Sequence, residues 1–160
     1  MLFSLSSCAF VRDLLVMNAF VVARDREFSY EDLSVTLTTD FMTMDFISED
    51  YLFIWGDGDV TVMGTEALLE EDVIGAVSAA DYAEIFADNL GITEEDAIGE
   101  LDGIPTIRYD VFNDEPYTYL VCIYESSDGF WVVVFGSEAE VYEEHYEEIC
   151  KYAKSVKIEK

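Results

Sequence analysis

The stretch Leu-Ser-Ser-Cys at residues 5–8 is the first place in the chain where residue types and spacing fit a known chemistry. A bulky apolar residue, two small residues and a cysteine are typical of the site at which bacterial lipoproteins are processed. There a diacylglycerol group alkylates the thiol, and the peptide before it is cut away. The pattern predicts Cys8 as a lipid attachment site. Only seven residues precede Cys8, against roughly 15–30 in a secretory signal peptide, so a chance tetrapeptide is the alternative.

Residues 9–23 follow Cys8 and are apolar, whereas lipoproteins usually continue into a polar tether. Arg12, Asp13 and Asn18 interrupt this stretch, which is also shorter than the roughly 20 residues needed to span a bilayer. We expect residues 1–26 to form an N-terminal segment, either a tether behind a lipid anchor or a helix packed on the domain. Residues 27–160 are expected to form one domain.

Arg108 is the only basic residue between Glu27 and Cys150, a span that holds 32 acidic residues. It lies in an alternating stretch that is expected to be a strand, on the face shared with Asp110 and Phe112. One interpretation is a cross-strand ion pair on the face of a sheet. The other is a binding site in which Arg108 anchors an anionic ligand.

Aromatic side chains are concentrated in the expected strands, and most of them must be buried in the core. Some can line an exposed groove that binds a peptide, a sugar or another small molecule. Trp55 and Trp131 are the aromatic candidates for such a site, and with Arg108 they make up the predicted ligand-binding residues.

The sequence marks no set of side chains for catalysis or for metal binding. The only histidine, His145, is flanked by acids, and zinc sites need clusters of cysteine and histidine. Residues 57–62 begin like a calcium-binding loop but lack its sixth-position glycine, so a hairpin turn is expected. Cys122 and Cys150 are expected to be free thiols, with a disulfide between them left open. We therefore expect a protein that is not an enzyme and that holds no metal or cofactor, while weak calcium binding by acidic clusters stays open.

The composition combines a formal net charge of −27 with 51% hydrophobic and 14% aromatic residues. A chain so rich in aromatic residues can bury a core, unlike a disordered acidic tail. Nucleic acid is a poor partner because its binding needs basic side chains. An anionic membrane surface would repel the domain, so membrane contact is expected only through a lipid anchor at Cys8. The acids either keep the protein soluble or attract a cationic partner.

Alternating apolar residues and short turn sequences predict a series of strands. The run 130–136 is apolar on both faces and is therefore expected to be a central strand covered on both sides. The expected strands cover residues 28–30, 33–38, 51–55, 60–63, 97–101, 106–112, 117–125 and 130–136, with a short strand or extended tail at 155–158.

Two helices are expected, each from a capping residue and a periodic apolar stripe. Ser78 caps the first, which ends at Gly91. The second starts at Ser137, where Glu140 completes a capping box. The expected inward residues are Tyr82, Ile85, Phe86 and Leu90 in the first helix and Tyr142, Tyr146, Ile149 and Ala153 in the second.

Strands joined by tight turns imply a mostly antiparallel sheet, and an apolar central strand implies helices on both faces. We therefore expect the α+β class and an α/β/α sandwich with a sheet of about six or seven strands.

This order of elements resembles the fold shared by PsbP, the DcrB-like bacterial proteins and the yeast Ran-binding import factor Mog. The resemblance rests on the hairpin FSYEDLSVTLTTDF (28–41), the long hairpin at 104–136 and the closing helix with its tail at 142–158. It is strongest to the small lipid-anchored or secreted proteins of Gram-positive gut bacteria that carry this domain. Members of the fold act as binding or assembly modules without a common active site, so the resemblance assigns no catalytic residue. It does favour Cys8 as a lipid attachment site, because related bacterial proteins often begin with this pattern.

These observations predict a non-enzymatic binding or assembly module on the cell surface, lipid-anchored or secreted, with a protein, peptide or small molecule as ligand. The alternative is a cytoplasmic adaptor or chaperone of the DcrB-like type that holds an apolar segment of a partner protein. In that case residues 9–23 would be part of the folded protein.

Overall fold

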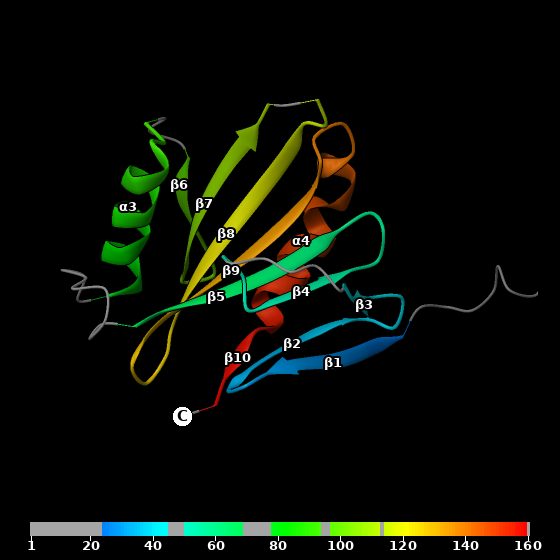
Figure 1. The fold of residues 1–160 in the computed structure, drawn as a ribbon, viewed down its shortest axis with the longest axis horizontal. Helices are drawn as coiled ribbons and strands as arrows, with labels where there is room; N and C mark the ends of the chain where they lie inside the picture. The colour runs from blue at the N-terminus through cyan, green and yellow to red at the C-terminus, as the bar shows by residue number, and fades with distance from the viewer. Residues whose placement is uncertain (1–23, 45–49, 69–77, 94–96, 113, 160) are drawn as a thin grey trace, which may run out of the picture.

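The computed structural model describes residues 24–44, 50–68, 78–93, 97–112 and 114–159. Cys8 and most of the expected N-terminal segment lie outside this part of the chain. The described residues form ten strands and two helices (Figure 1). The strands are β1 (Asp25–Tyr30), β2 (Leu33–Thr38), β3 (Met42–Thr43), β4 (Phe53–Gly56), β5 (Thr61–Leu68), β6 (Ile98–Leu101), β7 (Ile104–Val111), β8 (Tyr117–Glu125), β9 (Gly129–Glu138) and β10 (Lys157–Ile158), and the helices are α3 (Ala79–Leu90) and α4 (Tyr142–Ser155).

The larger sheet contains seven antiparallel strands in the order β3-β4-β5-β9-β8-β7-β6. Its centre is β9, in which every residue from Gly129 to Ser137 is buried. This burial confirms the sequence prediction that the apolar run at 130–136 is a central strand.

One pairing in the larger sheet joins distant parts of the chain. Thr61 of β5 lies opposite Gly136 of β9, and Leu68 lies opposite Gly129. All other neighbours in this sheet follow one another along the described sequence. The pairing of β5 with β9 therefore joins strands β3–β5 to strands β6–β9, which follow α3 in the sequence.

The smaller sheet has the order β1-β2-β10. Its first two strands form the hairpin that the sequence predicts, with the turn at Glu31 and Asp32. Ile158 of β10 pairs with Leu33 of β2, so the C-terminal tail returns to the N-terminal hairpin. The alternation predicts Phe28, Tyr30, Leu33, Val35 and Leu37 on the inward face; Tyr30 is partly buried and the other four are buried.

The buried side chains form two hydrophobic clusters that meet at β9. Successive residues of a strand point to opposite faces, and successive residues of β9 belong alternately to the two clusters. The first contains Trp131, Val133 and Phe135 of β9 together with Tyr142, Ile149, Tyr152 and Ala153 of α4 and the inward residues of the smaller sheet. The second contains Phe130, Val132 and Val134 of β9 together with Ala79, Ala83 and Ala87 of α3.

Helix α3 has the predicted ends, and its inner face agrees with the prediction in part, because Tyr82, Ile85 and Phe86 are partly buried against the second cluster. Ser78 is the N-cap, its Oγ accepting a hydrogen bond from the Asp81 backbone N–H at 3.2 Å, and Gly91 ends the helix at φ 72°. The buried residues, however, are three alanines, whereas Leu90 is 46% exposed. The larger apolar side chains flank this contact, because the small alanines let the helix axis approach the sheet.

Helix α4 begins later than predicted. The expected start at Ser137 is wrong, because β9 continues to Glu138, where it still pairs with Tyr117 of β8. The helix begins at Tyr142, and its N-cap Val141 makes no side-chain capping bond. Its predicted inward residues are buried except Tyr146, which is 37% exposed, while Tyr152 is buried although it was not predicted.

The fold is therefore α+β, with a seven-stranded antiparallel sheet, a three-stranded sheet and two helices. The strand count of the larger sheet agrees with the prediction, whereas its separation from the smaller sheet was not predicted.

Candidate functional site

Arg108 lies on β7 and contacts α4 rather than a neighbouring strand. Its Nη2 is 2.5 Å from Oε1 of Glu143, and its guanidinium carbon is 4.8 Å from the centre of the Tyr142 ring and 5.9 Å from that of Tyr146. The residue opposite it on β8 is Leu120. The expected cross-strand ion pair is thus wrong, because the partner carboxylate comes from α4. The hydrogen bond with Glu143 raises the pKa of Arg108 above its usual value, so the group stays cationic.

A hollow of about 710 Å³ lies beside Arg108. The end of α3 forms one wall, and the last residues of β7 form the other. The lining residues are Leu90, Gly91, Ile92, Ala97 and the β7 segment 108–112.

This hollow extends around the outer edge of β7. Arg108, Asp110 and Phe112 point to one face of the sheet, and Tyr109 and Val111 point to the other, because side chains alternate along a strand. All five line the same hollow. A hollow lined from both faces of one strand must include the edge of that strand.

The edge of β7 is open at this point in the described part of the chain. Strand β6 pairs with β7 only as far as Ile98 opposite Ile107, and the Arg108 backbone N–H donates to Ala97 O at 2.8 Å. Outward backbone groups recur at every second residue of a strand, so those of Asp110 come next. No residue that the structure describes pairs with them. The Asp110 side chain accepts a hydrogen bond from Thr118 Oγ1 at 2.6 Å.

Exposed apolar side chains surround the open edge. Phe112 is 83% exposed and Leu90 46%, and both line the hollow. Exposed apolar groups gathered at one hollow are typical of interaction sites.

A second hollow, of about 440 Å³, lies between the edge strands β1 and β3. Its base includes Phe28 and Trp55, whose ring centres are 5.5 Å apart, and the Arg26 guanidinium lies 4.9 Å above the Phe28 ring. Trp55 is only 4% exposed, so it contributes little more than a ring edge to this hollow.

Trp131 lines neither of these hollows. It is fully buried in the first cluster, and its Nε1 donates to Asp32 Oδ1 at 2.9 Å. The structure therefore does not bring Arg108, Trp55 and Trp131 together: the first lines one hollow, the second lines another and the third lies in the core.

The cysteines, the histidine and the aspartate of the predicted hairpin turn are the other side chains that were considered for chemistry. Cys122 and Cys150 are free thiols, and burial raises the pKa of Cys122 to about 12. His145 lies 3.7 Å from Glu148 on the same helix. Asp57 Oδ1 accepts from the backbone N–H groups of Asp59 and Val60, which confirms the predicted hairpin turn. Across the described ranges, no group of three or more His, Cys, Asp or Glu side chains is placed to hold a metal ion.

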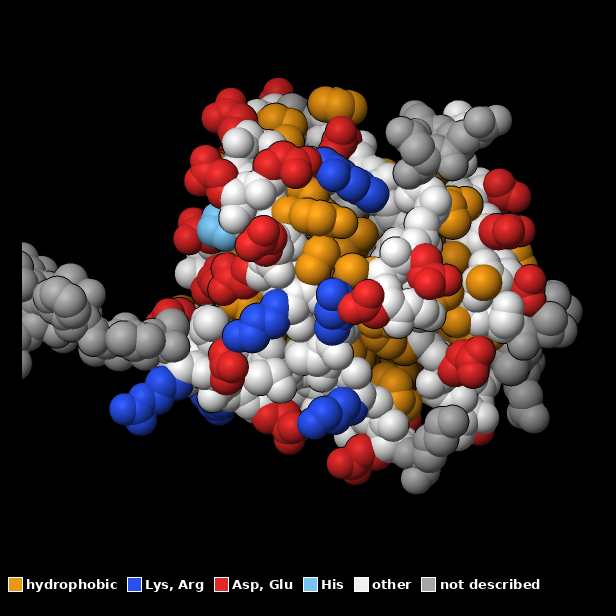
Figure 2. Space-filling view, turned by 180° about the vertical axis from the view of Figure 1, so that it is seen from behind, with side chains coloured by type: hydrophobic (Ala, Val, Ile, Leu, Met, Phe, Trp, Pro, Cys, Tyr) orange, Lys and Arg blue, Asp and Glu red, His pale blue; other side chains and the backbone are white. Residues whose placement is uncertain are grey.

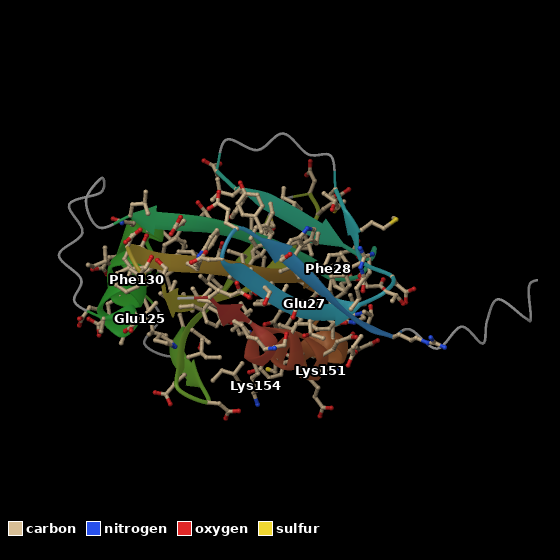
Figure 3. The ribbon with its side chains drawn as sticks, turned by 90° about the horizontal axis from the view of Figure 1, so that it is seen from below. Glu27, Phe28, Glu125, Phe130, Lys151 and Lys154 are labelled. Atoms are coloured by element: carbon tan, nitrogen blue, oxygen red, sulfur yellow. The ribbon has the colours of Figure 1, made fainter. Side chains whose placement is uncertain are left out.

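Within the described residues, three ion pairs connect α4 to its surroundings. Besides Arg108 with Glu143, Lys151 pairs with Asp25 at 3.0 Å, and Lys154 pairs with Asp102 at 2.7 Å. Figure 3 shows both lysines on α4; Lys151 reaches Asp25 of β1, the strand that also carries Glu27 and Phe28. The rear of the molecule shows basic side chains around a hydrophobic band, with acidic side chains around them (Figure 2).

Sequence reasoning singled out Arg108 but missed its surroundings. Tyr142 was expected to face inward, yet nothing in the sequence placed it under the guanidinium, and Leu90 was assigned to the core. The one signal for this site in the sequence was the position of Phe112, because an apolar residue next to Asn113 and Asp114 is unusual in a turn.

Comparison with known proteins identifies the fold. The chain resembles cyanobacterial PsbP from Synechocystis sp., with a TM-score of 0.58 at 10% identity, over 99% of both chains. It also resembles a protein from Bacteroides thetaiotaomicron, with a TM-score of 0.54 at 9% identity, over 84% of this chain and 48% of the other. This chain thus spans about half the length of the Bacteroides protein. The fold is PsbP-like, as the sequence pattern predicts.

No family model matches the sequence, and no curated protein matches it. No helix in the described ranges is long and apolar enough to cross a bilayer.

Proposed function

We propose that this protein is a non-enzymatic binding or assembly module whose ligand site is the hollow beside β7. The observation that carries the proposal is that hollow itself, because it combines exposed apolar side chains, a fixed guanidinium and an open strand edge. Ligand sites are usually concave and mostly apolar, with a few polar groups that orient the ligand.

A segment of another protein is the ligand class that suits this hollow best. Phe112 and Leu90 offer apolar contact area, and the hollow is open along a strand rather than enclosed like a small-molecule pocket. Nucleic acid remains a poor ligand, because the surface of so acidic a protein repels phosphates.

We propose further that the protein acts at the cell surface, anchored through a lipid on Cys8 or secreted. The support is the residue pattern at 5–8 and the resemblance to lipid-anchored bacterial proteins of this fold. The alternative is a cytoplasmic adaptor of the DcrB-like type that holds an apolar partner segment, and the exposure of Phe112 and Leu90 favours it.

We also infer that α3 and α4 cover opposite faces of the larger sheet, as in an α/β/α sandwich. The support is the alternation along β9, where Val132 and Val134 pack with the alanines of α3, and Val133 and Phe135 pack with α4.

Photo-crosslinking tests the binding site. The photoreactive residue benzoylphenylalanine replaces Phe112 in one variant and Asp128 in the control, which is exposed in the turn at the other end of β8. After irradiation in the native host, we expect a discrete protein adduct at position 112 and none at position 128. Absence of adducts at 112, or equal adducts at both positions, would contradict the proposal.

The location is tested on the N-terminal peptide of the protein made from its own gene. A peptide from the membrane fraction that begins at Cys8 and carries a diacylglycerol group supports the surface lipoprotein. An intact Met1 in a cytoplasmic protein supports the adaptor instead.

A further inference from the structure

We propose that the hollow accepts an extended, basic segment of a partner protein, which adds to the larger sheet as a strand along β7. This inference rests on the proposed function and names the form and charge of the ligand.

The first argument is the geometry of the strand edge. Strand β6 occupies the outer edge of β7 up to Arg108, whose N–H bonds to Ala97 O, and the outward N–H and C=O of Asp110 follow. Within the described residues these groups of Asp110 are unpaired, and unpaired backbone groups at a strand edge are a template for another strand. The hollow of about 710 Å³ lies along this edge, and an added strand needs only the usual spacing of about 4.8 Å from β7.

The second argument is the chemistry of the two walls. On one side of β7, Tyr109 and Leu90 offer apolar contacts to every second side chain of an added strand. On the other side, Asp110 lines the hollow together with Arg108, whose positive charge is already paired with Glu143. A segment of alternating apolar and basic residues would place its apolar side chains against α3 and its basic side chains near Asp110.

The third argument is the charge of the whole protein. A formal net charge of −27 attracts a cationic segment and increases its association rate. A second copy of this chain would bring the same negative charge, so edge-to-edge pairing of two copies is disfavoured.

Amide hydrogen exchange, measured by NMR on the whole protein, tests the geometry directly. The probe is an acetylated and amidated octapeptide of alternating lysine and valine, and the control is the same peptide with glutamate in place of lysine. We expect the Asp110 amide to exchange freely in the unbound protein. The lysine peptide should slow this exchange at least tenfold, whereas the glutamate peptide should not.

Two variants separate backbone pairing from charge. Asp110→Pro removes the outward N–H, which β8 does not use, and should weaken peptide binding about tenfold. Asp110→Asn keeps the N–H and should bind the peptide with a smaller loss. Increasing NaCl should weaken binding of the lysine peptide, because salt screens exposed charges.

The outcomes distinguish this inference from the proposed function. Slow exchange of Asp110 in the unbound protein would overturn it, because the chain itself would then cover the edge. A crosslinked partner at position 112 that leaves Asp110 exchange unchanged would overturn strand addition but not the binding module. Sedimentation showing a dimer that protects Asp110 would replace the partner segment with a second copy and overturn the inference.

Discussion

Cys122 on β8 is fully buried, and burial raises the pKa of its thiol from 9.0 to about 12. Below pH 9 the thiol is protonated in both the folded and unfolded states, and its contribution to stability is constant. Above pH 9 only the unfolded state loses the proton, so the free energy of unfolding falls by up to about 1.4 kcal/mol per pH unit until about pH 12. We expect this decline in urea unfolding measured by circular dichroism at a series of pH values.

The variant Cys122→Ala isolates this effect. Burial also raises the pKa of tyrosines such as Tyr109 and Tyr142, but their ordinary pKa of 10.0 means that they contribute mainly at higher pH. Between pH 8 and pH 10 the variant should therefore show a smaller slope than the natural protein. Equal slopes would mean that the buried thiol is not the titrating group.

Arg108 stabilises the contact between β7 and α4 through stacking as well as through charge. Its ion pair is exposed, at 45% for Arg108 and 69% for Glu143, so the pair alone contributes little. With the Tyr142 ring beneath the guanidinium, we expect Arg108→Ala to lower the free energy of unfolding by about 1 kcal/mol. Arg108→Lys should recover only part of the loss, because an ammonium group lacks the flat guanidinium surface.

Lys154→Ala is the matched control in the same urea unfolding series. Lys154 also pairs with a carboxylate, that of Asp102, but among the described residues no aromatic ring lies beneath the ammonium group of Lys154. Its replacement should therefore have the smaller effect. A loss as large as that of Arg108→Ala would show that stacking is unimportant.

At the level of elements, the contact of α3 with the sheet depends on small side chains. Ala83 of α3 is fully buried, and it belongs to the same hydrophobic cluster as the strand residues Val121 and Val132. Ala83→Leu should lower the free energy of unfolding by about 1–3 kcal/mol, because the larger side chain pushes the helix outward. The measurement is again urea unfolding.

Glu84→Leu provides the control for this substitution. Glu84 is the next residue of α3 and is exposed, so its replacement should change the free energy of unfolding by no more than about 0.5 kcal/mol. If both variants were equally stable, α3 would not be packed on its alanine face.

The ends of α3 could be predicted from the sequence, whereas its inner face could be predicted only in part, because the buried alanines were missed. Capping by Ser78 and termination by Gly91 are local chemistry, visible within a few residues. The inner face depends on how closely the helix approaches the sheet, and a hydrophobicity pattern favours large residues such as Leu90 over alanine. The start of α4 was missed for a similar reason: the pattern from Ser137 to Glu140 suits a cap, but pairing with β8 keeps the chain extended.

The candidate site was predictable only in part. Arg108 stands out in the sequence because it is the only cation in a long acidic span. Its partners Glu143 and Tyr142 come from a helix whose register against the sheet is set by tertiary packing, which no local pattern reports. The open edge at Asp110 likewise depends on where β6 ends relative to β7.

The whole molecule carries 35 acidic and 8 basic residues, and at this scale we expect repulsion to outweigh the ion pairs of α4. Net charge far from zero destabilises the compact state, and salt screens it over a Debye length that falls from about 10 Å at 0.1 M to about 3 Å at 1 M. We therefore expect the midpoint of urea unfolding to rise as the NaCl concentration increases from about 0.05 M to about 0.5 M. A falling midpoint would show that the ion pairs outweigh the repulsion.

The pairing of β5 with β9 also bears on the order of folding. Strands β6 to β9 follow one another as hairpins, so each can close over a short length of chain, and such local contacts form fast. Strand β5 must close a long loop to reach β9, which costs more entropy than closing a hairpin. We expect the β6–β9 meander to form first and the docking of β5 to limit the folding rate. Conservative substitutions in β5 should then mainly slow folding. Substitutions that instead mainly accelerate unfolding would show that β5 docks after the rate-limiting step.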